Sequence, residues 1–409
     1  NNQTTAGNLL NDLSGSVTRI QQGFDLRDPK DPVFRGYTDG VKFKVRDWHA
    51  NEFSWFFKDS WKVRPALTLN LGIHYDWYGV PYEAKGLAGN AVGGEAGLCG
   101  ISCGSLTKVE FVGKNSPNPN KQMWNDDWNN FAPSFGLSWS LPWFGKDKTV
   151  LRAGYGWNYS GNNINGGNSS PIRASMPGTV GGSAEGTNRG LIYTQASYLS
   201  LANLTLPIPQ QNAPLQPPLL DGSRSENIYV VADNRRTPYI QNFNFEIQRE
   251  LAQNLTLNVA YVGTKGTRLW GAINLNTVDI FTNNFLDAFN TTRSGNNAAI
   301  FDQMLRGLNL GSGVINGTTV TGSASLRANT NTRALIANGN VGQLADFLNR
   351  STSVTNKGGG FVRNSGLFPE TFFVLNPQFN GVNLHANPGS STYHSLQVQA
   401  TKRLSKGFN

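Results

Sequence analysis

The chain has 409 residues, including 46 glycines, and only 15% of its residues are charged, a composition that does not suit a soluble α/β layout. No run of about 18 apolar residues occurs, which excludes a transmembrane helix but does not exclude strands that cross a membrane. The formal net charge of +9 comes from Lys and Arg residues scattered singly, so it does not indicate nucleic-acid binding. A solvated surface or attraction to anionic lipid head groups explains the charge as well.

The N-terminal region carries weak signals. The sequence begins at Asn1, without a charged segment followed by an apolar one, so we expect either a removed signal peptide or an internal fragment. A first, weak strand is predicted near Leu13 to Phe24, and a long loop at about residues 24–50 follows it.

A hairpin at about residues 51–79 is the first strong signal, because large apolar side chains occupy every second position. Side chains of a strand alternate between its two faces, so one face is predicted to be apolar and the other polar. The apolar face is expected to carry Trp55, Trp61, Leu69, Tyr75 and Trp77. The polar face is expected to carry Lys58, Asn70 and His74. Lipid on one side and water on the other produce this alternation.

The next predicted loop, at about residues 79–130, contains the two cysteines of the chain, Cys99 and Cys103, in a Gly-rich segment. No further Cys or nearby His completes a set of four ligands, so zinc is not expected. A small loop disulfide in an oxidising compartment is the favoured interpretation, and two free thiols in a reducing cell are the alternative.

The second hairpin, at about residues 130–160, keeps the same alternation. Trp139, Tyr155 and Trp157 are expected on its apolar face, and Arg152 on its polar face. A loop at about residues 160–238 follows, and its Gly, Asn, Ser and Pro residues predict an extended segment.

The third hairpin, at about residues 238–270, repeats the pattern. Its apolar face is expected to carry Phe243, Phe245 and Tyr261, and its polar face Asn242, Glu246 and Asn258. The segment Gly263–Gly266 lacks the spacing and the following helix of a phosphate loop, and we expect a turn there.

A last loop at about residues 271–390 is predicted to be partly helical, because apolar residues such as Phe285, Met304 and Leu344 belong to groups with helical spacing. We expect a small folded cap there, and not a cofactor site. A final strand is predicted at residues 391–404.

A soluble β-sandwich also alternates apolar and polar residues, so alternation alone does not identify a membrane protein. The predicted strands are about 10 to 13 residues long, which exceeds the usual strand of about 5–6 residues and suits a tilted membrane strand. Short and long connections also alternate, so that all the short ones lie at one end, and aromatic residues gather near the strand ends. These features favour a membrane-spanning β-protein over a soluble β-sandwich.

The hairpins resemble those of a known family, the TonB-dependent outer-membrane receptors, and within it the Oar-like group. The resemblance rests on Phe56–Val63 with Leu67–Gly72, where Lys58 and His74 depart from the family pattern, and on Asn130–Gly136 with Thr149–Gly156. Tyr239–Glu250 with Ala260–Leu269, and Ser391–Gln397 with Lys402–Gly407, are similar to later hairpins of the same group.

This resemblance implies an all-β fold, a transmembrane antiparallel β-barrel of about 22 strands with long, partly helical extracellular loops. Residues 1–409 would form a single partial barrel domain, an internal fragment that lacks the plug domain. The implied function is uptake or export of an unidentified extracellular ligand across the outer membrane of a Gram-negative bacterium, driven by the TonB complex through the missing plug and TonB box. The polar-face residues would line the lumen, and the apolar-face residues would contact lipid.

Other functions remain open as alternatives. The chain could anchor a surface adhesion or scaffold protein whose large loops bind partners, or it could be a soluble β-rich carbohydrate-binding protein. Catalysis is not expected, because His74 and Asp76 on the polar face form a pair of a kind that alternating polar positions produce by chance. No cofactor is expected.

Overall fold

A computed structural model describes residues 3–13, 20–23, 25–35, 40, 45–92, 108–143, 145, 148–161, 190–193, 213–214, 227–351 and 360–403. Cys99, Cys103 and, apart from Pro214, the Pro-rich part of the loop at about residues 160–238 lie outside this range, and the predicted disulfide stays a prediction.

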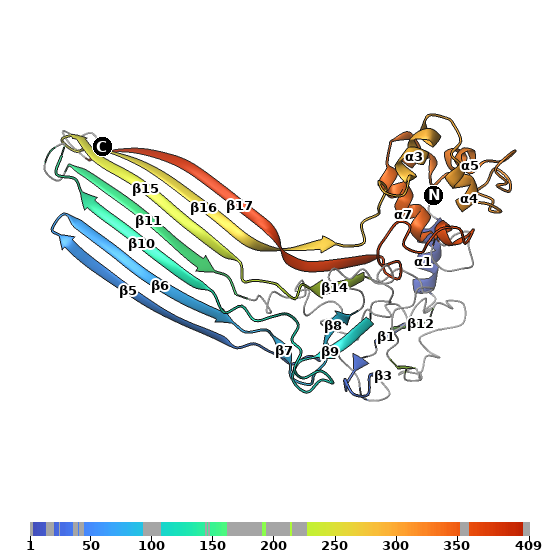
Figure 1. The fold of residues 1–409 in the computed structure, drawn as a ribbon, viewed down its shortest axis with the longest axis horizontal. Helices are drawn as coiled ribbons and strands as arrows, with labels where there is room; N and C mark the ends of the chain where they lie inside the picture. Colours follow the sequence, from blue (N-terminus) through green and yellow to red (C-terminus); the bar gives the residue numbers. More distant parts are fainter. Residues whose placement is uncertain are drawn as a thin grey trace.

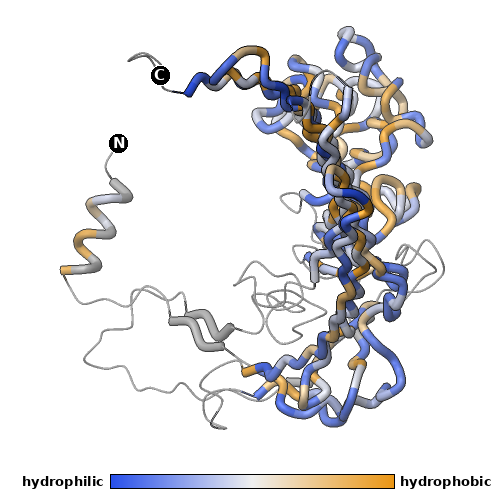
Figure 2. Tube along the Cα trace, turned by 90° about the vertical axis from the view of Figure 1, so that its left-hand side faces the viewer, coloured by the Kyte–Doolittle hydropathy of each residue, from blue (hydrophilic) through white to orange (hydrophobic). Residues whose placement is uncertain are grey.

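The main feature is one sheet whose strands follow the order β14-β17-β16-β15-β11-β10-β6-β5. Its long strands pair antiparallel with one another. They are β5 (Glu52–Arg64), β6 (Leu67–Tyr78), β10 (Phe131–Ser140), β11 (Thr149–Tyr159), β15 (Tyr239–Ala252), β16 (Leu255–Asn274) and β17 (Gly381–Lys402). The short β14 (Asn227–Val231) pairs parallel with the first residues of β17. Seen along the strands, the sheet is strongly curved (Figure 2).

The connections at the two ends of the sheet differ greatly. Two-residue turns at 65–66 and 253–254 join β5 to β6 and β15 to β16, and a short connection at 141–148 joins β10 to β11. Figure 1 shows these turns together at one end and the long loops and helices at the other. At the second turn Asn254 has a φ of 66°, a left-handed conformation that suits a tight hairpin.

Several predicted boundaries change. Of the weak strand predicted near Leu13 to Phe24, only β1 (Ile20–Gly23) is a described strand there, and Leu13 ends the helix α1 (Gln3–Leu13). The predicted turn at Gly263–Gly266 is wrong, because these residues pair on both sides within β16. β16 continues to Asn274 and β17 begins at Gly381, so the last loop is shorter than predicted.

Small strands build the rest of the loop end. β2 (Asp25–Leu26), β3 (Val33–Arg35) and β13 (Ala213–Pro214) form one sheet, and β4 (Trp48–His49) pairs with β7 (Tyr82–Glu83), β8 (Ala88–Val92) with β9 (Lys108–Val112), and β1 with β12 (Gly190–Tyr193). A hydrophobic cluster joins β2, β3, β8 and β9 to β14 and β17, and its most buried members include Leu26, Phe34, Ile228 and Val382.

The predicted cap between β16 and β17 is present as a bundle of short helices. They are α3 (Phe285–Arg293), α4 (Ala299–Met304), α5 (Gly322–Ala328), α6 (Arg333–Ala337), α7 (Val341–Arg350) and the 3-10 helix η6 (Phe361–Arg363). Phe285, which is completely buried, makes edge contacts with Phe301 and Phe373 at ring-centroid distances of 5.6 and 4.9 Å. The cap therefore has a hydrophobic core of its own.

Asn276 and Asn376 are hydrogen-bonded where the chain enters and leaves the cap, a place that we call the neck. The Asn276 side-chain amide donates to the carbonyls of Asn376 and Phe379 at 2.7 and 3.1 Å, and its oxygen accepts from the Asn376 backbone amide at 2.8 Å. Buried amides with full partners specify one arrangement of the backbone. Within the part of the chain that the structure describes, none of these helices is both long enough and apolar enough to span a bilayer.

A clasp of polar and aromatic residues holds the loops over the ends of β10, β15 and β16. The buried Asp127 carboxylate accepts from Arg236 Nη1 at 3.0 Å and from the Thr237 backbone amide at 2.8 Å. The neighbouring Arg235 guanidinium lies between the rings of Trp124 and Trp270, 4.5 and 4.1 Å from their centroids. Burial lowers the pKa of Arg235 to about 10, which leaves it charged at neutral pH.

We expect Phe285→Ala to destabilise the cap by about 3–5 kcal/mol, because it opens a cavity in the cap core. Phe281, which is 77% exposed beside the same helix, provides the control, and Phe281→Ala should change stability by less than about 0.5 kcal/mol. Hydrogen exchange of the cap in the detergent-solubilised protein measures both effects. Equal effects of the two substitutions would contradict the assigned core.

We expect Asp127→Asn to loosen the clasp, because Arg236 and Thr237 donate to different oxygens of the carboxylate, and in asparagine one of these oxygens becomes an NH2 group that cannot accept. The cost should be about 1–3 kcal/mol. Exchange of the amides at 235–240 should speed up, whereas Asp233→Asn, an exposed change in the same loop, should leave it unaltered. Unchanged exchange in Asp127→Asn would show that the clasp does not hold this segment.

Candidate functional site

The cross-strand register divides the long strands into two faces. Trp55 on β5 lies opposite Tyr75 on β6, which lies opposite Phe131 on β10, and the same face continues to Phe245 and Tyr261 on β15 and β16. All the residues predicted to contact lipid share this face: Trp55, Trp61, Leu69, Tyr75, Trp77, Trp139, Tyr155, Trp157, Phe243, Phe245 and Tyr261. We refer to it as the apolar face.

Side chains of the apolar face are well exposed for their size. Phe57 is 67% exposed, Trp61 56% and Val398 63%. In a β-sandwich, a second sheet would bury such a face. The exposure of these side chains does not fit a sandwich.

The residues predicted to face the lumen all lie on the opposite, polar face: Lys58, Asn70, His74, Arg152, Asn242, Glu246 and Asn258. The Arg152 guanidinium donates to Glu246 at 3.0 Å and to Gln248 at 2.9 Å, across the β11–β15 pair. The Thr264 hydroxyl donates to Asn242 at 3.2 Å across the next pair. The sequence predicted that these residues share one face, and the register shows which of them lie opposite one another on neighbouring strands.

Glycines on the polar face make room for its longer side chains. Gly154 lies opposite Asn244, whose side-chain oxygen occupies the place that a Cβ at residue 154 would need. Most side chains of the polar face are amides, hydroxyls and a few charged groups.

Phe56 and Asp59, which the sequence analysis did not assign to a face, depart from the alternation. Phe56 lies opposite His74 and so belongs to the polar face, where it is 77% exposed. Asp59 lies opposite Leu71 and so belongs to the apolar face. Three consecutive aromatic residues, Trp55, Phe56 and Phe57, cannot all lie on one face of a strand. This run is the sequence signal that could have placed Phe56 on the polar face.

Aromatic residues gather at both ends of the strands. At the loop end, the rings of Trp77 and Trp128 stack at a centroid distance of 4.6 Å, and those of Trp157 and Tyr239 stack at 4.9 Å. At the turn end, Trp143 meets Trp139 edge to face at 5.4 Å. Amphipathic rings at two levels are typical of proteins that cross a bilayer.

The predicted pair of His74 and Asp76 is present on the polar face. His74 Nε2 lies 3.1 Å from Asp76 Oδ1, and the Asp76 side chain is almost completely buried. Among the residues that the structure describes, no group of three or more His, Cys, Asp and Glu side chains is arranged to hold a metal ion.

Comparison with known proteins identifies the family. A family model described as "Outer membrane beta barrel domain" matches residues 31–409. A search of curated proteins gives no match.

Solved structures give distant likenesses. The siderophore receptor PirA from Pseudomonas aeruginosa is 9% identical with a TM-score of 0.24, and the match covers 55% of this chain and 24% of that one. The hemophore receptor HasR from Serratia marcescens, solved with its hemophore HasA and heme, is 13% identical with a TM-score of 0.28, covering 56% and 27%. The FrpB iron transporter from Neisseria meningitidis is 10% identical with a TM-score of 0.22, covering 54% and 19%.

The matched part thus spans about a quarter of the length of those receptors or less. Scores this low carry no argument about ligand or mechanism. The family model, by contrast, covers far more than half of the chain. The chain therefore belongs to the outer membrane beta barrel domain family and to the outer membrane of a Gram-negative bacterium.

Proposed function

We propose that the chain forms part of the barrel wall of a TonB-dependent receptor of the Oar-like group. Such a receptor binds an extracellular ligand on its outer loops and moves it across the outer membrane when the TonB complex pulls a plug domain. The observation that carries this proposal is the asymmetry of the sheet, with tight turns at one end and folded loops with hydrophobic clusters at the other. A wall that only spans the membrane would not need such loops.

In this proposal the apolar face contacts lipid and the polar face contacts the lumen. The exposed aromatic and aliphatic side chains of the apolar face support the first assignment. The hydrogen-bonding side chains and glycines of the polar face support the second, because they offer a surface on which a plug can dock and slide. Lys58, which has no ion-pair partner among the described residues, would be available to a plug carboxylate. No catalytic step belongs to this function.

A second function, anchoring of a surface adhesion or scaffold protein, is favoured by the helical cap. The cap has its own core and a hydrogen-bonded neck, so it can present a rigid surface to a partner without any transport. Both functions share the same wall and differ in whether a plug couples to TonB.

We expect Phe245→Arg to destabilise the protein in lipid bilayers by about 2–4 kcal/mol, because residue 245 lies in the middle of β15 on the apolar face. Asn244→Arg is the matched control, since residue 244 is one position away on the polar face and faces Gly154. Its cost should be below about 1 kcal/mol. Urea unfolding from vesicles measures both, and a larger cost for Asn244→Arg would reverse the two faces.

The complete protein tests the transport proposal. Its gene should encode a plug and a TonB box, and the periplasmic domain of TonB should crosslink to the receptor in membranes. Deleting the TonB box should abolish the crosslink while leaving the protein in the outer membrane. A complete protein without these parts, and without a crosslink, would favour the anchoring function.

A further inference from the structure

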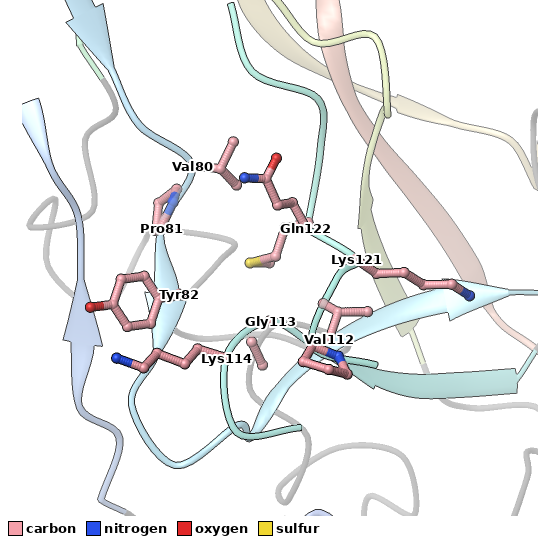
Figure 3. Close-up of a pocket in the computed structure, with 11 residues that line it drawn as sticks. Val80, Pro81, Tyr82, Val112, Gly113, Lys114, Lys121 and Gln122 are labelled. Atoms are coloured by element: carbon pink, nitrogen blue, oxygen red, sulfur yellow. The ribbon is translucent and has the colours of Figure 1, made fainter. Parts of the chain in front are cut away.

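A pocket of about 190 Å³ opens at the loop end, between β7, the start of β8 and the segment after β9 (Figure 3). Its buried floor consists of Pro81, Ala88, Val112 and Met123. An apolar cavity of about 150 Å³ is large enough to take up benzene. The pocket therefore has room for one aromatic ring and a short substituent.

The wall of the pocket is held in place by backbone hydrogen bonds. Gly113 has a φ of +90°, a conformation that other residues rarely adopt, and its amide donates to the carbonyl of Lys121 at 2.9 Å. The Asn118 side-chain amide donates to the carbonyl of Phe111 at 2.9 Å. The Tyr82 ring stacks on His49 at a centroid distance of 5.4 Å. The pocket is thus formed before any ligand arrives.

Among the described residues that line the pocket, the charged ones are Lys114 and Lys121, and none is acidic. Lys121 extends away from the pocket, where its ammonium binds both carboxylate oxygens of Glu110 at 2.9 and 3.1 Å. Lys114 lies on the same side of the pocket as Tyr82 and has no carboxylate partner among the described residues. Its ammonium is therefore available to an anion at the mouth.

We propose that this pocket binds a small aromatic carboxylate, with the ring against Val112 and Met123 and the carboxylate at Lys114. The apolar floor favours a ring, and methionine sulfur makes favourable contacts with aromatic rings. The cationic rim selects a carboxylate over a neutral or cationic substituent. This inference deepens the proposed receptor function, and its biological role rests on that function. The binding of the ligand to the pocket does not depend on it.

The test uses 3-phenylpropionate as the probe and the complete protein purified from outer membranes in detergent. Binding is measured by saturation-transfer NMR and equilibrium dialysis. Lys114→Gln removes the rim charge without touching the floor. Lys85→Gln is the matched control, because Lys85 is an exposed lysine of the same region that does not line the pocket. Ala88→Val narrows the floor, and circular dichroism verifies that each variant is folded.

We expect saturable binding to the unaltered protein, a loss of about two- to fivefold in Lys114→Gln, and no change in Lys85→Gln. Binding should be lost in Ala88→Val, and 3-phenylpropanol should bind less tightly than the acid. Absence of saturable binding, or equal binding to all folded variants, would overturn the site. The TonB crosslink is measured separately, so the failure of this pocket and the failure of the receptor function give different results.

Discussion

The structure depends on the cross-strand register of seven long strands, because register decides which side chains share a face. A shift by one residue would move every side chain of a strand to the other face. Here the pairing runs from β5 to β17, with irregularities at Lys62/Arg64, at Glu250/Ala252 and between Gly266 and Gly271, and most of the large apolar side chains lie on one face. In a bilayer the backbone must satisfy its own hydrogen bonds, and between neighbouring long strands the ladders of this sheet do so without help from the side chains. The side chains are then free to form one apolar face and one polar face.

The hydrophobic cores lie at the loop end, and among the long strands only the first residues of β17, such as Val382, take part in one of them. The cap cluster around Phe285 and the cluster around Leu26 and Ile228 both belong to the loop end. Each of these loop structures needs its own core because the sheet offers no apolar interior on which they could pack. This division explains why polar contacts over long sequence distances, such as Asp127 with Arg236 and Asn276 with Asn376, connect the loops. The same arrangement creates the pocket floor at Val112 and Met123.

The sequence was sufficient to assign residues to a face wherever apolar and polar residues alternate along a strand. Trp55, Leu69 and Phe245 were assigned to one face because alternation is a local property, and the register agrees. Phe56 and Asp59 do not follow the alternation, so the sequence did not assign them to a face.

Features built from distant segments could not be predicted in the same way. The extension of β16 and β17 to Asn274 and Gly381 depends on pairing over about a hundred residues, as between Asn274 and Asn383. The pocket likewise combines three segments that have no common pattern, so sequence reasoning missed Tyr82 and Lys114 as candidate binding residues. Helical spacing, in contrast, was a sufficient signal for the cap.

The central claim is that the apolar face contacts lipid and the polar face contacts water, and nitroxide scanning along β15 tests it most directly. Single cysteines are placed at each residue from 241 to 248, in a background in which Cys99 and Cys103 are serine, and labelled in the protein reconstituted into vesicles. The account predicts a period of two, with high oxygen accessibility at residues 243, 245 and 247 and low accessibility at their neighbours. Equal accessibility at neighbouring residues, or the opposite phase, would contradict it.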